Sequence, residues 1–200
     1  MKKCILIFAL LFALLPVYAQ DSSPDNPEAP AEIDWFEYEV YSRGDRPLYI
    51  SLGLVFPTVF IGAPAYMGLS VGGAGILSYD YFLTPNVFLG GEIGGMFSFS
   101  RSGHSLFIIP FGARIGYQFV FRRIEIPLTL MVGLAPQLYL NQNYFGPIVK
   151  AGGSVFYRYN SSWSFGINTS WWLIPQWSTG PNPAVYGNFL ELTISARHHF

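Results

Sequence analysis

An alternation of apolar with small or polar residues constrains this chain more than any other feature of its sequence. In residues 48–56 the even positions hold Leu, Ile, Leu, Leu and Phe, while the odd positions hold Tyr, Ser, Gly and Val. The alternation returns in at least seven further segments. A period of two residues is that of a β-strand with one apolar face, whereas a membrane-spanning helix would be apolar all round.

Long uncharged stretches raise the competing prediction of transmembrane helices. Residues 47–79 and 126–149 carry no charged side chain, and only 12% of the chain is charged against 18% aromatic. Pro57, Pro64 and the glycines between 68 and 75 would break or weaken a helix in the first stretch. So little charge also excludes a disordered chain. We therefore predict an all-β chain, with a helical inner-membrane protein as the alternative that circular dichroism would decide.

Turn-like sequences separate the alternating segments. Three connections (83–86, 122–123 and 160–162) are short and alternate with four longer ones. This pattern predicts an eight-stranded antiparallel up-and-down transmembrane β-barrel over residues 47–200, with both chain ends on one side. Four prolines in these segments are expected near the rims or at bulges, because proline cannot donate to a ladder. The predicted strands are 47–57, 66–82, 87–100, 106–121, 124–140, 147–159, 163–174 and 185–200, and the prolines are Pro110, Pro127, Pro136 and Pro147.

The first twenty residues have the pattern of a secretory signal. Two lysines precede an apolar run from Ile5 to Leu15, which is too short for a spanning helix of about 20 residues. Small residues predict cleavage of residues 1–19 between Ala19 and Gln20. A retained N-terminal anchor is the alternative. Export would place the short turns of the barrel in the periplasm.

Residues 20–46 differ sharply from the rest in composition. From residue 21 to residue 46, eight acids face two arginines, a net charge of −6, whereas residues 47–200 hold seven bases and four acids, a net charge of +3. We predict an acidic, Pro-rich periplasmic arm over 20–46. Its aromatic residues can dock on the oppositely charged periplasmic mouth of the barrel, or the arm can stay solvated. These aromatic residues are Trp35, Phe36, Tyr38 and Tyr41.

Outward-facing aromatic residues gather at two heights of the predicted barrel. Interfacial aromatic side chains do this in a membrane, so outer-membrane lipids are the expected surroundings. The predicted periplasmic girdle is Tyr79, Tyr81, Phe119, Phe121, Tyr157, Tyr159, Trp163 and Phe200, and the outer girdle is Phe56, Phe97, Phe99, Phe107 and Trp171.

Charged strand residues fall on the inward face together with small residues. An eight-stranded barrel leaves a lumen only wide enough for side chains, so charges there must pair. Centring the 101–105 connection places Glu92 opposite Arg114. Glu125, beside a turn, is the one charge expected off this face. We predict a charge network that plugs the lumen, with a narrow hydrated path as the alternative, formed by Asp80, Glu92, Arg114, Lys150, Arg158, Glu191 and Arg197.

Candidate catalytic and metal-binding residues are few. His104 has serines nearby, but no neighbouring carboxylate orients its ring. His198 and His199 are adjacent on a strand, point to opposite faces and cannot chelate one metal. The only cysteine, Cys4, leaves with the signal, and the exported chain has 9 bases against 12 acids. We predict no catalytic residue, no cofactor, no metal and no nucleic-acid partner.

Two segments resemble the small eight-stranded outer-membrane proteins, the group of the OmpA transmembrane domain, OmpX and OmpW/OprG. One is the hairpin 78–99, SYDYFLTPNVFLGGEIGGMFSF, and the other is the terminal strand 190–200, LELTISARHHF. The resemblance covers about 47–200 and implies outer-membrane location in a Gram-negative-type envelope. It also implies that Phe200 and its strand are read by the barrel assembly machinery, although His198 departs from the usual apolar or aromatic residue.

Three functions remain for this fold, which is expected to be monomeric. A non-enzymatic structural or surface-interaction role fits the charge-plugged lumen. A porin-like narrow channel for small or hydrophobic solutes is the alternative, because OmpW-type members are associated with passage of small hydrophobic molecules. A lipid-modifying enzyme using His104 is the weakest candidate, and unchanged lipid chemistry in His104→Ala would end it.

Overall fold

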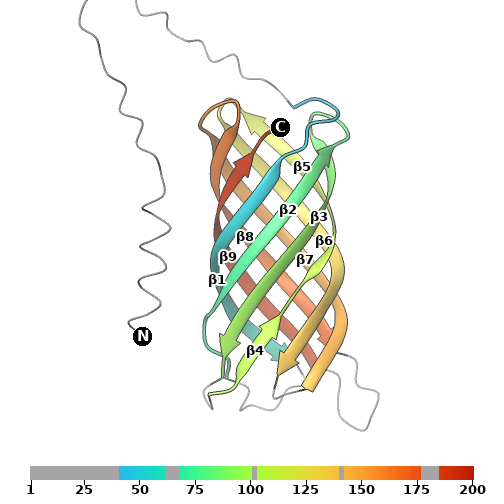
Figure 1. Cartoon of the computed structure of the whole chain (residues 1–200), viewed down its shortest axis with the longest axis vertical. Coiled ribbons are helices and arrows are strands. Elements are labelled where there is room, and N and C mark those ends of the chain that lie inside the picture. The colour runs from blue at the N-terminus through green and yellow to red at the C-terminus, as the bar shows by residue number, and fades with distance from the viewer. Residues whose placement is uncertain (1–40, 62–67, 101–102, 140–141, 177–184) are drawn as a thin grey trace, which may run out of the picture. The chain divides into compact units, whose positions relative to one another are not determined.

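Backbone hydrogen bonds join nine β-strands into one closed antiparallel barrel (Figure 1). The computed structural model describes residues 41–61, 68–100, 103–139, 142–176 and 185–200. Within these residues the strands are β1 Leu48–Ile61, β2 Gly72–Phe82, β3 Val87–Phe99, β4 Ser105–Ile108, β5 Phe111–Phe121, β6 Ile124–Tyr139, β7 Gln142–Arg158, β8 Trp163–Gln176 and β9 Val185–His198.

The first and last strands close the sheet. β1 pairs with β2 on one side and with β9 on the other, where Leu48 faces His198. Closure removes the sheet edges, and a sheet surrounded by hydrocarbon needs this because no water is there to bond an unpaired strand. No helix among the described residues is long and apolar enough to cross a membrane. The predicted all-β, eight-stranded antiparallel barrel is confirmed.

β4 and β5 are two parts of a single strand of the barrel. Both pair with β3 and with β6, and the register is the same before and after the break. The carbonyl of Pro110 accepts a hydrogen bond from the Gly94 amide at 2.8 Å, and the Ile109 amide donates to the Pro136 carbonyl at 2.9 Å. The proline removes one donor without inserting a residue, so the barrel is eight-stranded.

Two of the other predicted prolines, Pro127 and Pro136, lie towards the ends of β6, while Pro147 is the sixth residue of β7 and is paired with Leu134. Pro127 is the fourth residue of β6 and Pro136 the fourth from its end. The β6–β7 ladder skips residues 126 and 127 and resumes at Leu128 in the same register. Near the rims the missing donors are less costly than at mid-depth, since water can reach them.

The strand bounds differ from the prediction mainly away from the short turns. β1 continues to Ile61, β8 continues to Gln176, and β7 begins at Gln142 instead of 147. β2 begins later, at Gly72, and β9 ends at His198 rather than at Phe200. Apart from the end of β9, these differences lie at the end opposite the short turns. Both faces of several strands are apolar there, so the alternation that predicts strand bounds is lost from the sequence.

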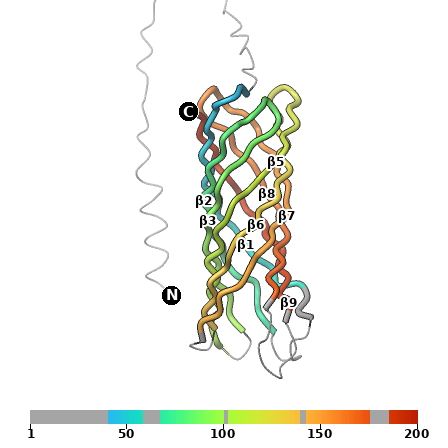
Figure 2. The backbone as a smooth tube through the Cα atoms, turned by 90° about the vertical axis from the view of Figure 1, so that its right-hand side faces the viewer, coloured from blue at the N-terminus to red at the C-terminus, as the bar shows by residue number. Residues whose placement is uncertain are grey.

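The two ends of the barrel are unlike. Both described chain ends and the three short turns lie at one end, which is uppermost in Figures 1 and 2 and is called the short-turn end here. The opposite end, where β1, β3, β6 and β8 finish, is called the long-loop end here. One of the four longer connections expected there is wrong, because Tyr139 of β6 pairs with Gln142 of β7. The two-residue turn between β5 and β6 places Arg122 in the left-handed region, with φ of 55°.

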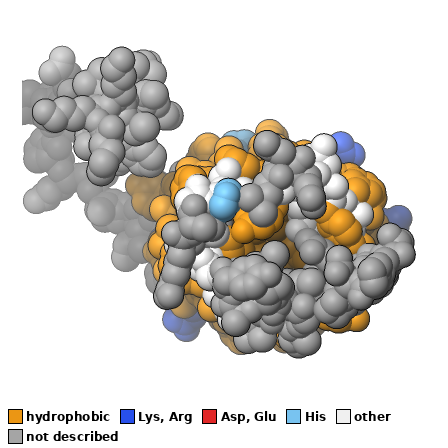
Figure 3. Space-filling model, turned by 90° about the horizontal axis from the view of Figure 1, so that it is seen from below, with side chains coloured by type: hydrophobic (Ala, Val, Ile, Leu, Met, Phe, Trp, Pro, Cys, Tyr) orange, Lys and Arg blue, Asp and Glu red, His pale blue; other side chains and the backbone are white. Residues whose placement is uncertain are grey.

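The lumen has a polar section and an apolar section. Charged and hydroxyl side chains occupy the half towards the short-turn end. Large apolar side chains occupy most of the half towards the long-loop end, together with the buried polar residues Ser98, Gln137 and Asn188. The view onto that end shows mainly hydrophobic side chains among the described residues (Figure 3). The expectation of a lumen holding only small and charged residues is wrong for this half. The apolar section consists of Val55, Ala74, Met96, Leu106, Ile108, Met131, Ala135, Ile148, Trp172, Ile174 and Phe189.

A charge placed on the outward face tests whether that face meets lipid. Leu130 is exposed near the middle of β6, between the outward-facing Ile115 and Ala151. We expect Leu130→Arg to lower the free energy of unfolding in phospholipid bilayers by about 2–4 kcal/mol, because a cation at mid-depth loses its hydration. Urea titration of the bilayer-inserted protein measures this.

Leu83, equally apolar and 42% exposed in the β2–β3 turn, is the matched control. Leu83→Arg should cost no more than about 1 kcal/mol at the interface. Equal effects of the two substitutions would contradict a lipid-facing band.

Candidate functional site in the barrel lumen

Five charged side chains form a continuous chain of ion pairs across the middle of the lumen. Arg114 lies between two carboxylates, with its Nε 3.2 Å from Asp80 Oδ1 and its Nη1 3.3 Å from Glu92 Oε2. Lys150 contacts Glu92 and lies 3.0 Å from Glu191 Oε2. All five are buried or nearly so, and they come from strands on opposite walls. This set, Asp80, Glu92, Arg114, Lys150 and Glu191, is called the mid-lumen network.

The mid-lumen network contains the Glu92–Arg114 contact in a different register from the one predicted. Glu92 lies opposite Gly112, and Arg114 lies opposite Gly90. A displacement of two residues keeps every side chain on its face. It also brings Arg114 within reach of Asp80, which faces the other side of Gly90.

Gly90 makes this arrangement possible because it has no side chain. A Cβ there would lie 2.2 Å from Asp80 Oδ1 and 2.3 Å from the Tyr79 carbonyl oxygen. Any larger residue would push Asp80 out of the space it occupies beside Arg114. A glycine at this inward position is therefore part of the network's geometry.

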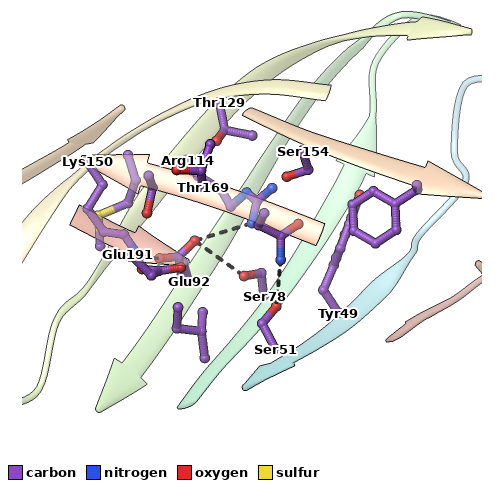
Figure 4. A pocket seen from close by; sticks show the side chains of 15 residues that line it. Tyr49, Ser51, Ser78, Glu92, Arg114, Thr129, Lys150, Ser154, Thr169 and Glu191 are labelled. Carbon is purple, nitrogen blue, oxygen red and sulfur yellow. Dashed lines mark hydrogen bonds and ion pairs between the residues drawn. The ribbon is translucent and has the colours of Figure 1, made fainter. Parts of the chain in front are cut away.

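An enclosed polar cavity of about 40 Å³ adjoins the mid-lumen network. Figure 4 shows Glu92, Glu191 and Lys150 together at one side of it, with Tyr49 at the other side. The Asn168 amide donates to Ser51 at 3.4 Å and to Thr193 at 3.1 Å near its wall. A polar space of this size holds a few water molecules and no larger solute.

Trp172 joins the mid-lumen network to the apolar section. Its Nε1 donates to Glu191 Oε2 at 2.7 Å, and Lys150 Nζ lies 4.5 Å from the ring centroid. The ring is fully buried and packs against Phe189 at 6.4 Å. One side chain thus satisfies a buried carboxylate, stabilises a buried ammonium through its ring face and fills apolar space.

A second network surrounds Arg197 at the short-turn end. Arg197 and Glu125 are both fully buried and in direct contact. Arg197 Nη1 also donates to Gln118 Oε1 at 3.2 Å, and its guanidinium lies over the Phe156 ring at 3.9 Å. Arg158 is the second cation here, with Nη1 3.5 Å from Glu125 Oε1. The terminal network is defined as Tyr41, Gln118, Glu125, Arg158, Arg197 and His199.

Tyr41 inserts from the N-terminal arm into this terminal network. Its ring stacks on Phe82 at 4.2 Å, and its hydroxyl donates to Glu125 Oε2 at 3.0 Å and accepts from Arg197 at 2.8 Å. His199 Nδ1 lies 3.0 Å from the same hydroxyl. The docking expected for the arm's aromatic residues is thus observed for Tyr41, while Trp35, Phe36 and Tyr38 lie outside the described residues.

Burial shifts the pKa values of the two members that lie outside the strands. Desolvation, followed by the nearby Arg197 and Arg158, lowers the pKa of His199 to about 3. Desolvation raises the pKa of Tyr41 above its usual range, although Arg197 opposes the shift. Both groups are therefore neutral at pH 7. They bond the charged pair without adding a charge to it.

Glu125 corrects the sequence analysis on the charge balance of the lumen. It was expected off the inward face, but it lies inside and fully buried. With it, the lumen holds four carboxylates and four cations. The mid-lumen network has three carboxylates and two cations, and the terminal network has one carboxylate and two cations. The signal was present in the sequence, since Glu125 has the same parity as the inward Thr129 and Met131.

The predicted girdle residues lie on the outward face. Most of them are exposed, from 39% for Trp163 to 73% for Phe200, whereas Phe56 and Tyr81 are half-buried. Several outward aromatic rings touch, including Phe97 with Phe99 at 6.0 Å. The sequence analysis omitted four further exposed outward aromatic residues: Phe111, Tyr117, Phe145 and Phe165.

The remaining candidate residues do not assemble into a reactive site within the described part of the chain. His104 is exposed, with its ring 6.4 Å from that of Tyr139. Ser102, Ala19 and Gln20 lie outside the described residues. His198 and His199 point to different faces, His198 towards Trp163 and Phe200. Among the described residues no three His, Cys, Asp or Glu side chains are grouped so as to hold a metal ion.

Comparisons with known proteins agree with this architecture. A protein-family model matches residues 25–198. An uncharacterized protein of Treponema pallidum (strain Nichols) is 26% identical, covering 99% of this chain and 96% of the relative. One of Borreliella burgdorferi is 24% identical, covering 77% of each chain.

Two solved structures have the same fold. Neisserial surface protein A superposes with a TM-score of 0.61 at 12% identity, covering 78% of this chain and 97% of that one. The outer membrane protein OprG from Pseudomonas aeruginosa gives 0.51 at 9%, covering 80% and 97%. The chain therefore has the fold of the small eight-stranded outer-membrane β-barrels.

Removing the carboxylate of the terminal network should destabilise the folded barrel. We expect Glu125→Gln to lower the free energy of unfolding by about 3–5 kcal/mol, because it leaves two buried guanidinium groups without their common counter-ion. Urea unfolding in detergent micelles measures the change. Tyr41→Phe, which removes only the hydroxyl, should cost about 1–3 kcal/mol. Wild-type stability in both variants would show that the buried pairs do not hold this end together.

Protonation of His199 should couple stability to pH. The folded-state pKa of about 3 lies below the unfolded value of about 6.5, so the unfolded chain binds the proton first as pH falls. The contribution of neutral His199 is complete above about pH 6.5 and is lost progressively towards pH 3. We expect the urea midpoint of wild type to fall more between pH 7 and pH 5 than that of His199→Gln. Parallel curves for the two proteins would refute this coupling.

Proposed function

The chain belongs to the family whose model covers residues 25–198, and we propose that it is an integral outer-membrane β-barrel with a closed lumen, acting without catalysis in a structural or surface-interaction role. Export by a cleaved signal and assembly as a monomer through the C-terminal strand are parts of this proposal. The observation that carries it is the apolar section of the lumen.

The apolar section supports a closed lumen more strongly than the ion pairs do. A charged network can hydrate and let ions pass, whereas a constriction lined by apolar side chains excludes water and with it every hydrated ion. Trp172, Ile108, Ile148, Ile174 and Phe189 are each at most 2% exposed. They fill the half of the lumen that a solute would have to cross after the polar section.

The outward face supports placement in a membrane. Many of its apolar side chains are exposed, for example Leu52, Ile167 and Ile194, at 58%, 59% and 69%. A soluble protein rarely exposes apolar patches of this extent, because they drive association. Fold neighbours among outer-membrane proteins agree with the outer membrane as the site.

A groove at the long-loop end favours the second candidate function, passage of small hydrophobic solutes. It has a volume of about 690 Å³ and crosses β3, β4, β6 and β7. The pairs Met96–Ile108 and Ile108–Gln137 continue across the same wall, however, so the backbone leaves no gap there. The groove is lined by Gly95, Met96, Phe97, Phe107, Ile108, Ile109, Pro136, Gln137, Leu138, Asn143, Tyr144 and Phe145.

Single-channel recording tests which section closes the lumen. Residues 20–200, refolded into a planar bilayer, should give no ion conductance. Emptying the apolar section with Trp172→Ala and Phe189→Ala together should produce openings, because water can then fill the constriction. Glu92→Gln, which breaks the mid-lumen network and leaves the apolar section intact, should stay silent.

Folding of each variant is confirmed by heat-modifiable gel migration before recording. Steady conductance of the wild type would overturn the closed lumen. Conductance in Glu92→Gln but not in the Trp172/Phe189 double variant would assign closure to the charges instead.

A further inference from the structure

The charges of the described residues are divided between the lumen and one rim. Four cations and four carboxylates lie inside the barrel. The other four arginines, Arg43, Arg46, Arg122 and Arg123, are exposed at the short-turn end. Outside the lumen the described residues carry one acidic side chain, Asp45, besides the terminal carboxylate. This rim is therefore positive while the barrel interior is neutral.

Two of the four rim arginines are held against the lipid-facing tyrosines. The Arg46 guanidinium lies over the Tyr81 ring, 5.7 Å from its centroid. Arg123 Nη1 donates to the Tyr157 hydroxyl at 3.4 Å. Both tyrosines belong to the girdle at the short-turn end, so these cations lie at the height where the barrel leaves the hydrocarbon.

Arg122 occupies a backbone conformation that its side chain disfavours. Its φ of 55° is in the left-handed region, which Gly and Asn adopt with little strain. A strained non-glycine residue at an exposed turn tip points to a use for its side chain. Here the side chain adds a second adjacent cation to the tip of the β5–β6 turn.

We propose that the four rim arginines form an interfacial ring that binds the phosphate headgroups of anionic phospholipids in the leaflet touching the short-turn end. Guanidinium groups match phosphate oxygens with paired hydrogen bonds, and cations near an anionic surface are attracted to it. Arg46 lies beside β1 and β2, while Arg122 and Arg123 lie between β5 and β6. The four cations therefore lie at two places on the rim, each beside strands whose outward faces meet lipid in the proposed membrane placement.

The acidic arm is the competing occupant. Seven acids lie between residues 21 and 39. The packing of Arg46 and Arg123 on outward-facing tyrosines favours the membrane over a segment gathered at the mouth. Lipid binding by the rim arginines rests on the proposed membrane placement. The experiment below distinguishes a failure of the lipid proposal from a failure of the membrane placement.

Spin-labelled lipids measure the preference directly. Full-length exported chain is placed in phosphatidylcholine bilayers that contain traces of labelled phosphatidylglycerol or labelled phosphatidylcholine, and the motionally restricted fraction is read by electron paramagnetic resonance. We expect phosphatidylglycerol to be enriched beside the protein by at least about twofold, and the enrichment to vanish in 1 M salt because screening shortens the attraction to about 3 Å. No restricted lipid of either kind would overturn membrane placement itself.

Arg46→Gln with Arg123→Gln should bring the ratio of the two lipids close to one, and Arg46→Lys with Arg123→Lys should retain part of the preference. Arg122→Asn distinguishes an effect of charge from an effect of misfolding. It should reduce the preference for phosphatidylglycerol, because one cation is lost. It should also raise the urea midpoint in zwitterionic micelles, because Asn relieves the strain of the turn. A wild-type ratio of one would overturn the lipid ring. The lipid ring would also be overturned if the ratio of phosphatidylglycerol to phosphatidylcholine rose above one only after the seven arm acids were changed to Asn and Gln. That result would show that the arm, and not the lipid, occupies the arginines.

Discussion

Pairing of buried charges inside a narrow barrel is the constraint on which this structure depends. Eight strands leave no room for a hydrated ion beside each charged side chain, so every cation has to find its carboxylate across the lumen. Arg197 and Glu125 show this most clearly, because both are fully buried and their contact links the last strand to the opposite wall. Tyr41 from the arm and Gln118 then bond the same pair. The terminal network thereby joins Tyr41, which precedes β1, to Arg197 and His199 at the end of β9, where the barrel closes.

The lumen contains two different kinds of side-chain contact, and they have different consequences. The ion pairs link particular side chains across the lumen, since Arg114 contacts both Asp80 and Glu92 in the observed register. The apolar section excludes water, which charges alone would not do. Trp172 belongs to both, because it bonds Glu191 and packs on Phe189. The order along the lumen, polar and then mainly apolar, makes the interior of the barrel differ between its two ends, as its turns do.

Alternation of residue types carried enough information to predict the barrel, because one face must be apolar wherever lipid touches it. It also placed Glu92, Arg114 and Lys150 on one inward face. It could not fix the register, since a slip of two residues leaves every side chain on its face and only the backbone pairing decides it. It missed the apolar section for a related reason. In a sequence such as Trp171 to Ile174, both faces are apolar, and residue type no longer separates lumen from lipid.

Neutrality inside the barrel and positive charge at one rim follow from the same rule. A carboxylate or a cation tolerates the lumen only in a balanced set, so four acids and four bases are retained there. Surplus charge has to lie where water or headgroups can solvate it. In the described part of the chain the surplus consists of arginines, and it lies at the end where Tyr41 and the turns also gather. The end that contains the terminal network is thus also the end with the exposed arginines.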